Sequence, residues 1–160
     1  MKSKLIIFSI ILFSAIMVAG GTVAWFSSSP DPTLTNGEMG IVKVEVISDG
    51  LGNICIKNLG KSDCYIRVRL IPQWSDQSLS VSNLDMDIND SDWTEMEGFH
   101  YYKDSLEVNG ITTNIIKSVD IGELTPEYEG ESLSIKVVAE GVQSANEAWK
   151  EVWSIDSLPF

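Results

Sequence analysis

The stretch CYIRVRLI, residues 64–71, decides the fold class, because apolar and polar side chains alternate along it. Successive side chains of an extended chain point to opposite faces, so this period of two predicts a strand with one face in a core and the other toward solvent. On the polar face, Arg67 and Arg69 are expected to pair with Glu or Asp of a neighbouring strand. The inward set is Cys64, Ile66, Val68 and Leu70, and the outward set is Tyr65, Arg67 and Arg69.

Five further segments have a similar composition, rich in Val and Ile and bounded by Gly, Asn, Asp or Ser. This composition is typical of strands. Six or more strands separated by turn signals predict an all-β protein, a sandwich or a barrel. The five segments are residues 40–48, 52–58, 78–88, 114–121 and 132–142.

One short helix is expected near the C-terminus, in QSANEAWKEVW, residues 143–153. Ser144 and Glu147 have the spacing of a capping box, in which each side chain bonds a free backbone N–H of the first turn. Trp149 and Val152 would then share one face with Ala148. Large rings along the rest of the chain are expected in the core and at its edges. These rings are Trp74, Trp93, Tyr101, Tyr102, Trp149 and Trp153.

The N-terminus has the features of an export signal over residues 1–24. Lys2 and Lys4 precede an apolar run, residues 5–19, that is followed by two glycines. Fifteen helical residues rise about 22 Å, which is less than the roughly 30 Å of a hydrocarbon core. A cleaved signal helix is therefore favoured over a permanent membrane anchor, and contact with the membrane is expected only through the uncleaved signal.

The small residues of Thr22-Val23-Ala24 suit a signal peptidase, so cleavage is predicted between Ala24 and Trp25. Residues 25–38, with several Ser and Pro, would form a flexible arm. Residues 39–160 would form the β-sandwich domain.

The mature chain is strongly acidic. The whole sequence has 11 Lys and Arg against 23 Asp and Glu, a net charge of −12, and loss of Lys2 and Lys4 makes it −14. Such a charge repels nucleic acid and anionic lipid, so a nucleic-acid partner is not expected.

The two cysteines leave two alternatives open. A two-residue turn at Leu59-Gly60 would place Cys55 opposite Cys64 and make a cross-strand disulfide plausible. The apolar pattern instead places Cys64 inward and Cys55 outward, which a three-residue loop centred on Gly60 would achieve. The second alternative is two separate thiols, one of them buried and inert.

Catalytic groups are scarce, and neither a catalytic residue nor a cofactor is predicted. The single histidine, His100, lies in a tyrosine-rich strand without an evident partner for acid–base chemistry. There is no H-E-x-x-H zinc motif and no phosphate-binding glycine loop.

Weak calcium binding is the only metal candidate, at Asp85, Asp87, Asp90 and Asp92 in DMDINDSDW. The spacing does not match a helix–loop–helix calcium loop, because Asp90 stands where Gly is needed and Met96 where Glu is needed. The alternation of acids with apolar residues indicates instead a half-buried strand with an acidic outer face.

Four blocks of the chain carry a family resemblance: GGTVAWF (20–26), IKNLGKSDCYIRVRLIP (56–72), DWTEMEGFHYYKDSL (92–106) and IKVVAEGVQSANEAW (135–149). In order and spacing they resemble the TasA, camelysin and BsaA group of proteins exported by Gram-positive bacteria. The chain is most similar to the clostridial BsaA-like branch, through YYKDSL and VVAEGVQ. The N-terminus resembles signals that a SipW-type signal peptidase processes.

This resemblance implies a jelly-roll-like antiparallel β-sandwich, secretion, and assembly into biofilm-matrix fibres. In the family, the mature N-terminal segment of one subunit completes the sheet of the next. The equivalent anchors here would be Trp25, Phe26 and Leu34. A strand added to an open edge satisfies unpaired backbone groups, and a head-to-tail contact propagates as a filament.

Two rival functions follow from the same resemblance. The first is a monomeric cell-surface or spore-coat adhesin. The second is a metalloprotease, as camelysin has been classed, although this sequence has no metal triad to support it.

Overall fold

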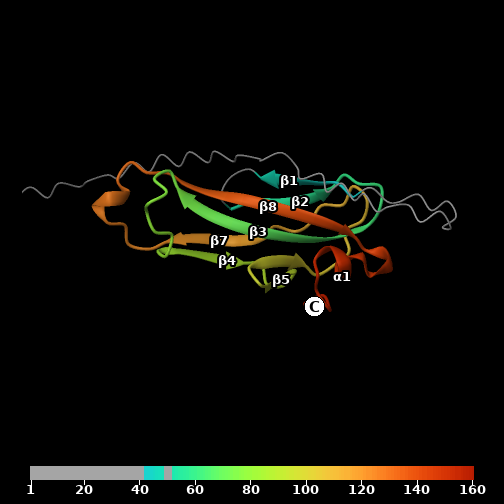
Figure 1. Ribbon diagram of the computed structural model, residues 1–160. Coiled ribbons are helices and arrows are strands. Elements are labelled where there is room, and N and C mark those ends of the chain that lie inside the picture. The colour runs from blue at the N-terminus through green and yellow to red at the C-terminus, as the bar shows by residue number, and fades with distance from the viewer. Residues whose placement is uncertain (1–41, 49–51) are drawn as a thin grey trace, which may run out of the picture.

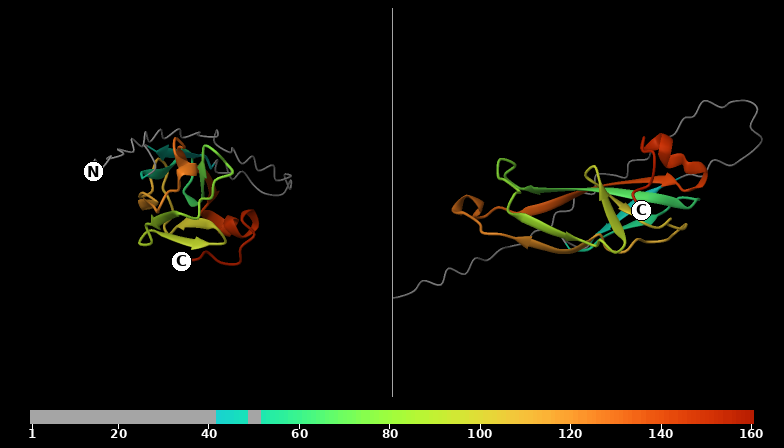
Figure 2. Two further views of the ribbon diagram at one scale, coloured as in Figure 1. Left: turned by 90° about the vertical axis from the view of Figure 1, so that its left-hand side faces the viewer. Right: turned by 90° about the horizontal axis from the view of Figure 1, so that it is seen from below.

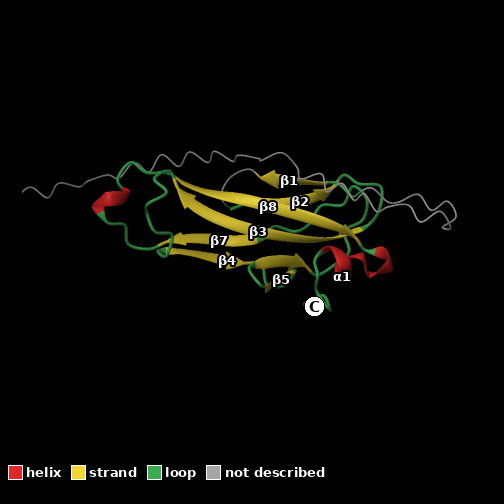
Figure 3. Ribbon diagram, viewed as in Figure 1, coloured by secondary structure: helices red, strands yellow, loops and turns green. Residues whose placement is uncertain are grey.

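The computed structural model describes residues 42–48 and 52–160 of the 160-residue chain, and strands predominate in these ranges (Figures 1 and 3). All strand pairs are antiparallel, so the predicted all-β class is confirmed. No helix within the two ranges is long and apolar enough to cross a bilayer. The elements are β1 (Val44–Ser48), β2 (Ile54–Asn58), β3 (Cys64–Trp74), β4 (Leu84–Ile88), β5 (Trp93–Met96), β6 (Phe99–Tyr102), β7 (Ile116–Ile121), η1 (Pro126–Tyr128), β8 (Leu133–Gln143), η2 (Ala145–Glu147) and α1 (Ala148–Val152).

The strands form one four-stranded sheet and two strand pairs. The sheet has the order β5-β6-β3-β8, and the pairs are β1-β2 and β4-β7. β3 and β8 are paired along their whole length, from Cys64 opposite Gln143 to Trp74 opposite Leu133. These two long strands run through the middle of the elongated molecule (Figure 1).

The core lies between the inner face of the four-stranded sheet and the two strand pairs, and Figure 2 shows the strands surrounding it. The alternation in 64–71 is confirmed, since Ile66 and Val68 are fully buried and Arg69 is exposed. Buried members from the other strands complete the core, with β1 and β4 packed against it. They include Ile54, Ile56, Trp93, Ile116, Ile135 and Ala139.

The expected β2–β3 hairpin is wrong. β2 pairs with β1, whereas β3 pairs with β6 and β8, so the chain crosses from one sheet to another after Asn58. Asn58 is fully buried, and its Nδ2 donates to the carbonyls of Ser62, Leu106 and Glu107. Its Oδ1 accepts from Gly60 N–H at 2.8 Å. The side chain thus satisfies backbone groups of the crossing, at Gly60 and Ser62, and of the segment beside it, at Leu106 and Glu107.

The free side of β2 is covered by an irregular segment, residues 106–115. Thr112 Oγ1 accepts from Ile56 N–H at 2.9 Å, and Asn114 Oδ1 accepts from Ile54 N–H at 2.8 Å. The backbone N–H groups of Thr112 and Ile115 donate back to β2. Two side chains therefore replace main-chain acceptors, which pairs this edge without a regular strand.

Two strand predictions need correction. The segment 78–88 is strand only from Leu84 onward. The tyrosine-rich strand around His100 is present as β6, but β5 and the hairpin turn that joins them were not predicted; the turn residues, Glu97 and Gly98, have φ values of 54° and 76°. A glutamate is unusual at positive φ, which is why this turn gives a weak sequence signal.

The predicted helix is shorter than expected and lacks the capping box. Ser144 makes no cap; its Oγ donates to the carbonyl of Asp63. Asn146 and Glu147 have φ values of 58° and 52°, which break the first turn. The expected apolar face is nevertheless present, because Trp149 is buried and Ala148 and Val152 pack around it. Packing onto the sheet, and not capping, holds this segment in place.

Candidate assembly edge and acidic segment

β8 presents an open strand edge among the described residues. At both ends of the β3–β8 pair, the N–H of Ser144 and of Ser75 donate across the pair, to Asp63 and Ser132. In an antiparallel pair, bonded positions alternate, so even-numbered β8 residues bond to β3 and odd-numbered ones direct N–H and C=O away from it. No described residue hydrogen-bonds to the outward groups. They belong to Leu133, Ile135, Val137, Ala139, Gly141 and Gln143.

The same odd-numbered residues carry the inward side chains of β8. Leu133, Ile135 and Ala139 are buried, and Val137 packs against the core. A strand that paired here would therefore lie at the rim of the core, where its alternate side chains could be buried. This is the geometry that strand addition requires.

β1 approaches β8 at one position, Gly141. A Cβ on Gly141 would lie 2.8 Å from Cγ1 of both Val42 and Val44. The glycine therefore permits the close approach of the two strands, although β1 bonds only to β2 among the described strands. The outward groups of Leu133, Ile135, Val137 and Ala139 lie on one side of this approach and have no hydrogen-bond partner among the described residues.

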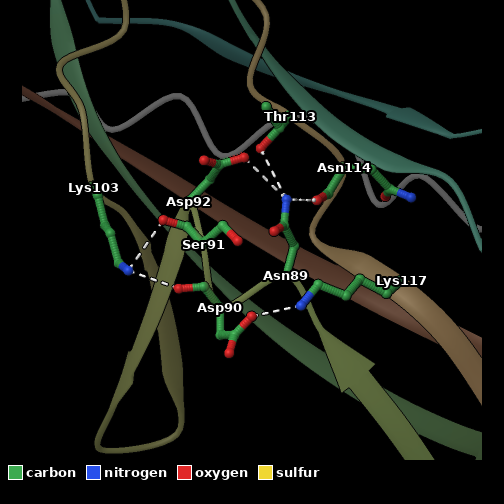
Figure 4. Close-up of polar contacts among 8 residues, drawn as sticks. All are labelled: Asn89, Asp90, Ser91, Asp92, Lys103, Thr113, Asn114 and Lys117. Carbon is green, nitrogen blue, oxygen red and sulfur yellow. Dashed lines mark hydrogen bonds and ion pairs between the residues drawn. The ribbon is translucent and has the colours of Figure 1, made fainter.

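The acidic segment between β4 and β5 is held by Asn89 and two lysines (Figure 4). Asn89 Nδ2 donates to Asp92 Oδ2 and to the carbonyl of Asn114. Lys117 Nζ lies 2.5 Å from Asp90 Oδ1. Lys103 Nζ donates to the carbonyls of Asp90 and Ser91 at 2.7 and 3.2 Å.

These contacts set the electrostatics of the segment. The hydrogen bond and charge of Lys117 lower the pKa of Asp90, and the same hydrogen bond raises the pKa of Lys117. Both groups are exposed, so this ion pair contributes little to stability.

The four calcium candidates are not gathered into a site. Asp85 and Asp87 are exposed on β4, whereas the Asp90 carboxylate is paired with Lys117, and Asp92 accepts from Asn89. Within residues 42–48 and 52–160, no three acidic, histidine or cysteine side chains are placed to share an ion. An ammonium group beside Asp90 also opposes a second cation there.

His100 lies on β6, opposite Val68 of β3 and Glu95 of β5. Its Nδ1 is buried without a hydrogen-bond partner among the described residues. Burial lowers the pKa of His100, and the charge of Glu95 only partly opposes this effect. The imidazole is therefore neutral at pH 7, and no arrangement for proton transfer surrounds it in the described structure.

The cysteine pair is not a disulfide. Cys55 lies on β2 opposite Ile47, and Cys64 begins β3 opposite Gln143, so the two belong to different sheets. The alternative of two separate thiols holds, with Cys64 inward and fully buried. Burial raises the pKa of the Cys64 thiol to about 12, with a smaller contribution from Asp63, so this thiol is inert at neutral pH.

An arginine–aromatic cluster covers one end of the outer face of the four-stranded sheet. Arg67 pairs with Glu140 on β8 at 2.7 Å, which confirms the expected ion pair for this residue, whereas Arg69 has no carboxylate partner among the described residues. Its guanidinium also lies over the rings of Phe99 and Trp153, at 4.2 and 4.9 Å from their centroids. Tyr101, buried beside Trp153, makes an edge-on ring contact with it at 5.6 Å.

Sequence reasoning placed the large rings in the core but missed this second cluster. The sequence feature that could have predicted this cluster is the four-residue spacing of Trp149 and Trp153, which brings both rings to one side of the short α1 segment. Five of the six expected rings are buried, and Tyr102 packs against the main core.

The signal over residues 1–24, the cleavage site at Ala24 and Trp25, and the arm anchors Trp25, Phe26 and Leu34 lie outside the described residues. So does the boundary at residue 39.

Comparison of the chain with protein-family models, with curated proteins and with solved structures finds no match.

Proposed function

We propose that this chain is a secreted structural protein of a Gram-positive bacterium that polymerises into extracellular biofilm-matrix fibres. A SipW-type signal peptidase releases the mature N-terminus, and the arm, residues 25–38, pairs with the next subunit. The fold is a jelly-roll-like sandwich, and residues 1–24 form the signal helix. The observation that carries the proposal is the edge of β8, whose outward backbone groups have no hydrogen-bond partner among the described residues and whose inward side chains are mostly apolar.

The arm supplies what the β8 edge lacks, namely backbone hydrogen-bond partners and apolar side chains. β8 directs outward N–H and C=O groups that have no partner in residues 42–48 and 52–160, and an incoming strand satisfies them. Trp25, Phe26 and Leu34 supply the side chains that an added strand buries in pockets. Because the arm and the edge are different surfaces of one subunit, the contact is heterologous and propagates.

Charge regulates this assembly. Subunits at −14 repel one another, and protons or divalent cations reduce that repulsion. Fibre formation is therefore expected to accelerate at acidic pH or with added calcium. Light scattering that is flat across both titrations would contradict this regulation.

The decisive test compares residues 25–160 with residues 36–160 by electron microscopy. The longer chain is expected to form filaments and the shorter one to stay monomeric. Equal filaments from both would refute arm donation. A monomeric longer chain would favour the adhesin.

A variant of β8 tests the acceptor edge separately. Val137→Pro removes an N–H that points away from β3, so the β3–β8 pairing keeps its bonds. Val137→Ala is the matched control, because it also shortens the side chain but keeps the N–H. Elongation is expected for the alanine variant and not for the proline variant; equal elongation would exclude β8 as acceptor.

A further inference from the structure

The outer face of β3 and β8 carries two cations beyond the arginine–aromatic cluster. Arg69 and Lys136 are both exposed, and neither is paired with a carboxylate of the described residues. Arg69 lies over the ring of Phe99, at 4.0 Å from its centroid. Between the two cations stand Ile71, 37% exposed, and the partly exposed Val138. This surface, called the cationic face below, is unusual on a chain with 11 basic and 23 acidic residues.

The outer face of β4 and β7 has the opposite charge. Asp85, Asp87 and Asp120 are exposed there, whereas Met86, Ile88 and Val119 pack against the core. Lys117 is also exposed on β7, and the charge of Asp87 helps to raise the pKa of Lys117, so the three carboxylates outnumber one nearby cation. Asp85 and Asp120 stand directly opposite each other in the register. Like charges at directly opposed positions destabilise a strand pair. This surface, called the acidic face below, lowers its own repulsion when a cation approaches.

The two faces are complementary in charge, and their charged residues have the same spacing. Arg69 opposes Val138 and Ile71 opposes Lys136, so the two cations lie on a diagonal of the strand pair. Asp87 and Asp120 lie on the same kind of diagonal. Diagonal neighbours of an antiparallel pair are about 7–8 Å apart, which is the same repeat on both faces.

We propose that the cationic face docks on the acidic face of a second copy of this chain. The two faces belong to different strand pairs, so the contact is heterologous and each subunit retains one free face. Ile71 and Val138 are covered, and Arg69 and Lys136 meet the carboxylates of Asp87 and Asp120. Each contact is weak, because exposed ion pairs are worth little singly.

This contact becomes effective when it is repeated many times along a filament. The inference therefore rests on the proposed function, which supplies the filaments. Subunits held in line present many such faces at once, so weak contacts add up to lateral bundling. The arm and β8 edge lengthen a filament, whereas the charged faces hold filaments side by side.

Charge-reversal variants of the secreted protein test the contact. The cationic-face variant is Arg69→Glu/Lys136→Glu, and its control is Lys57→Glu/Lys61→Glu, with the same change in net charge. The acidic-face variant is Asp87→Lys/Asp120→Lys, and its control is Asp104→Lys/Asp156→Lys. Electron microscopy counts the filaments that lie side by side. Sedimentation velocity measures the association of subunits at low salt and at roughly 0.5 M salt, where the Debye length is below about 5 Å and charge contacts are screened.

Each face variant alone is expected to associate about tenfold more weakly than its control at low salt. An equimolar mixture of the two face variants is expected to associate more strongly than either variant alone, and about as strongly as the mixture of the two controls, which has the same net charges. Face variants that behave like their controls would overturn the proposal. Absence of filaments in all samples would refute the proposed function, and the sedimentation comparison would then decide the face contact.

Discussion

Substitution of Asn58 by leucine should strongly destabilise the fold. The side chains are similar in volume, so the change removes hydrogen bonds without opening a cavity. Gly60 N–H and the carbonyl of Ser62 lose the only hydrogen bond that the described structure gives them. The carbonyls of Leu106 and Glu107 keep a second donor.

The magnitude follows from those two groups. A buried polar group left unsatisfied costs about 1–3 kcal/mol, so Asn58→Leu is expected to cost about 2–4 kcal/mol. Single domains are stable by about 5–15 kcal/mol, so this is a large share of the total. With a urea dependence of about 1–3 kcal/mol per molar, the unfolding midpoint should fall by about 1–2 M.

Urea unfolding followed by tryptophan fluorescence measures this shift. Asn53→Leu is the control, because Asn53 is exposed and surface substitutions usually change stability by less than about 0.5 kcal/mol. Asn58→Asp keeps an acceptor for Gly60 but buries a charge among carbonyls, so it should be less stable at pH 7 than at pH 4. A midpoint of Asn58→Leu equal to that of the control would refute the role assigned to Asn58.

Three further outcomes are expected. Gly141→Ala should cost about 1–3 kcal/mol, because the new Cβ collides with Val42 and Val44; a variant as stable as the native protein would show that β1 does not need this close approach. The unfolding free energy should fall as pH drops below about 6.5, because the unfolded chain protonates its histidine before the folded one does. His100→Gln should reduce this dependence of the unfolding free energy on pH between about pH 7.5 and 5.5. An unchanged dependence would show that other groups cause it. Cys64 should resist alkylation at pH 8 until urea unfolds the protein, and mass spectrometry showing fast labelling of Cys64 in the folded state would contradict its burial.

The strand alternation carried most of the correct predictions. A period of two specifies which side chains face inward, and Ile66, Val68 and Arg69 lie where it predicts. It does not specify the neighbour of a strand. The β2–β3 hairpin was wrong for this reason, since a turn sequence near Gly60 is compatible with both a hairpin and a crossing.

The candidate sites depended even more on contacts between distant residues. The spacing of the acidic residues alone suggested a calcium candidate. However, Lys103 and Lys117, which come later in the chain, contact Asp90, and the ammonium group of Lys117 occupies the place that a cation would take at its carboxylate. The open edge of β8 is likewise visible only once β3 is known to be its one partner among the described strands.

By itself, the sequence determined the all-β class, the inward and outward faces of the central strand, the burial of the large rings and the strong negative charge. These properties depend on composition and on neighbours within a few residues. Only the tertiary structure decided the strand order, the crossing at Asn58, the separation of Cys55 from Cys64, the open edge and the two charged faces. Each of these depends on which distant backbone groups satisfy one another, and no local period encodes that choice.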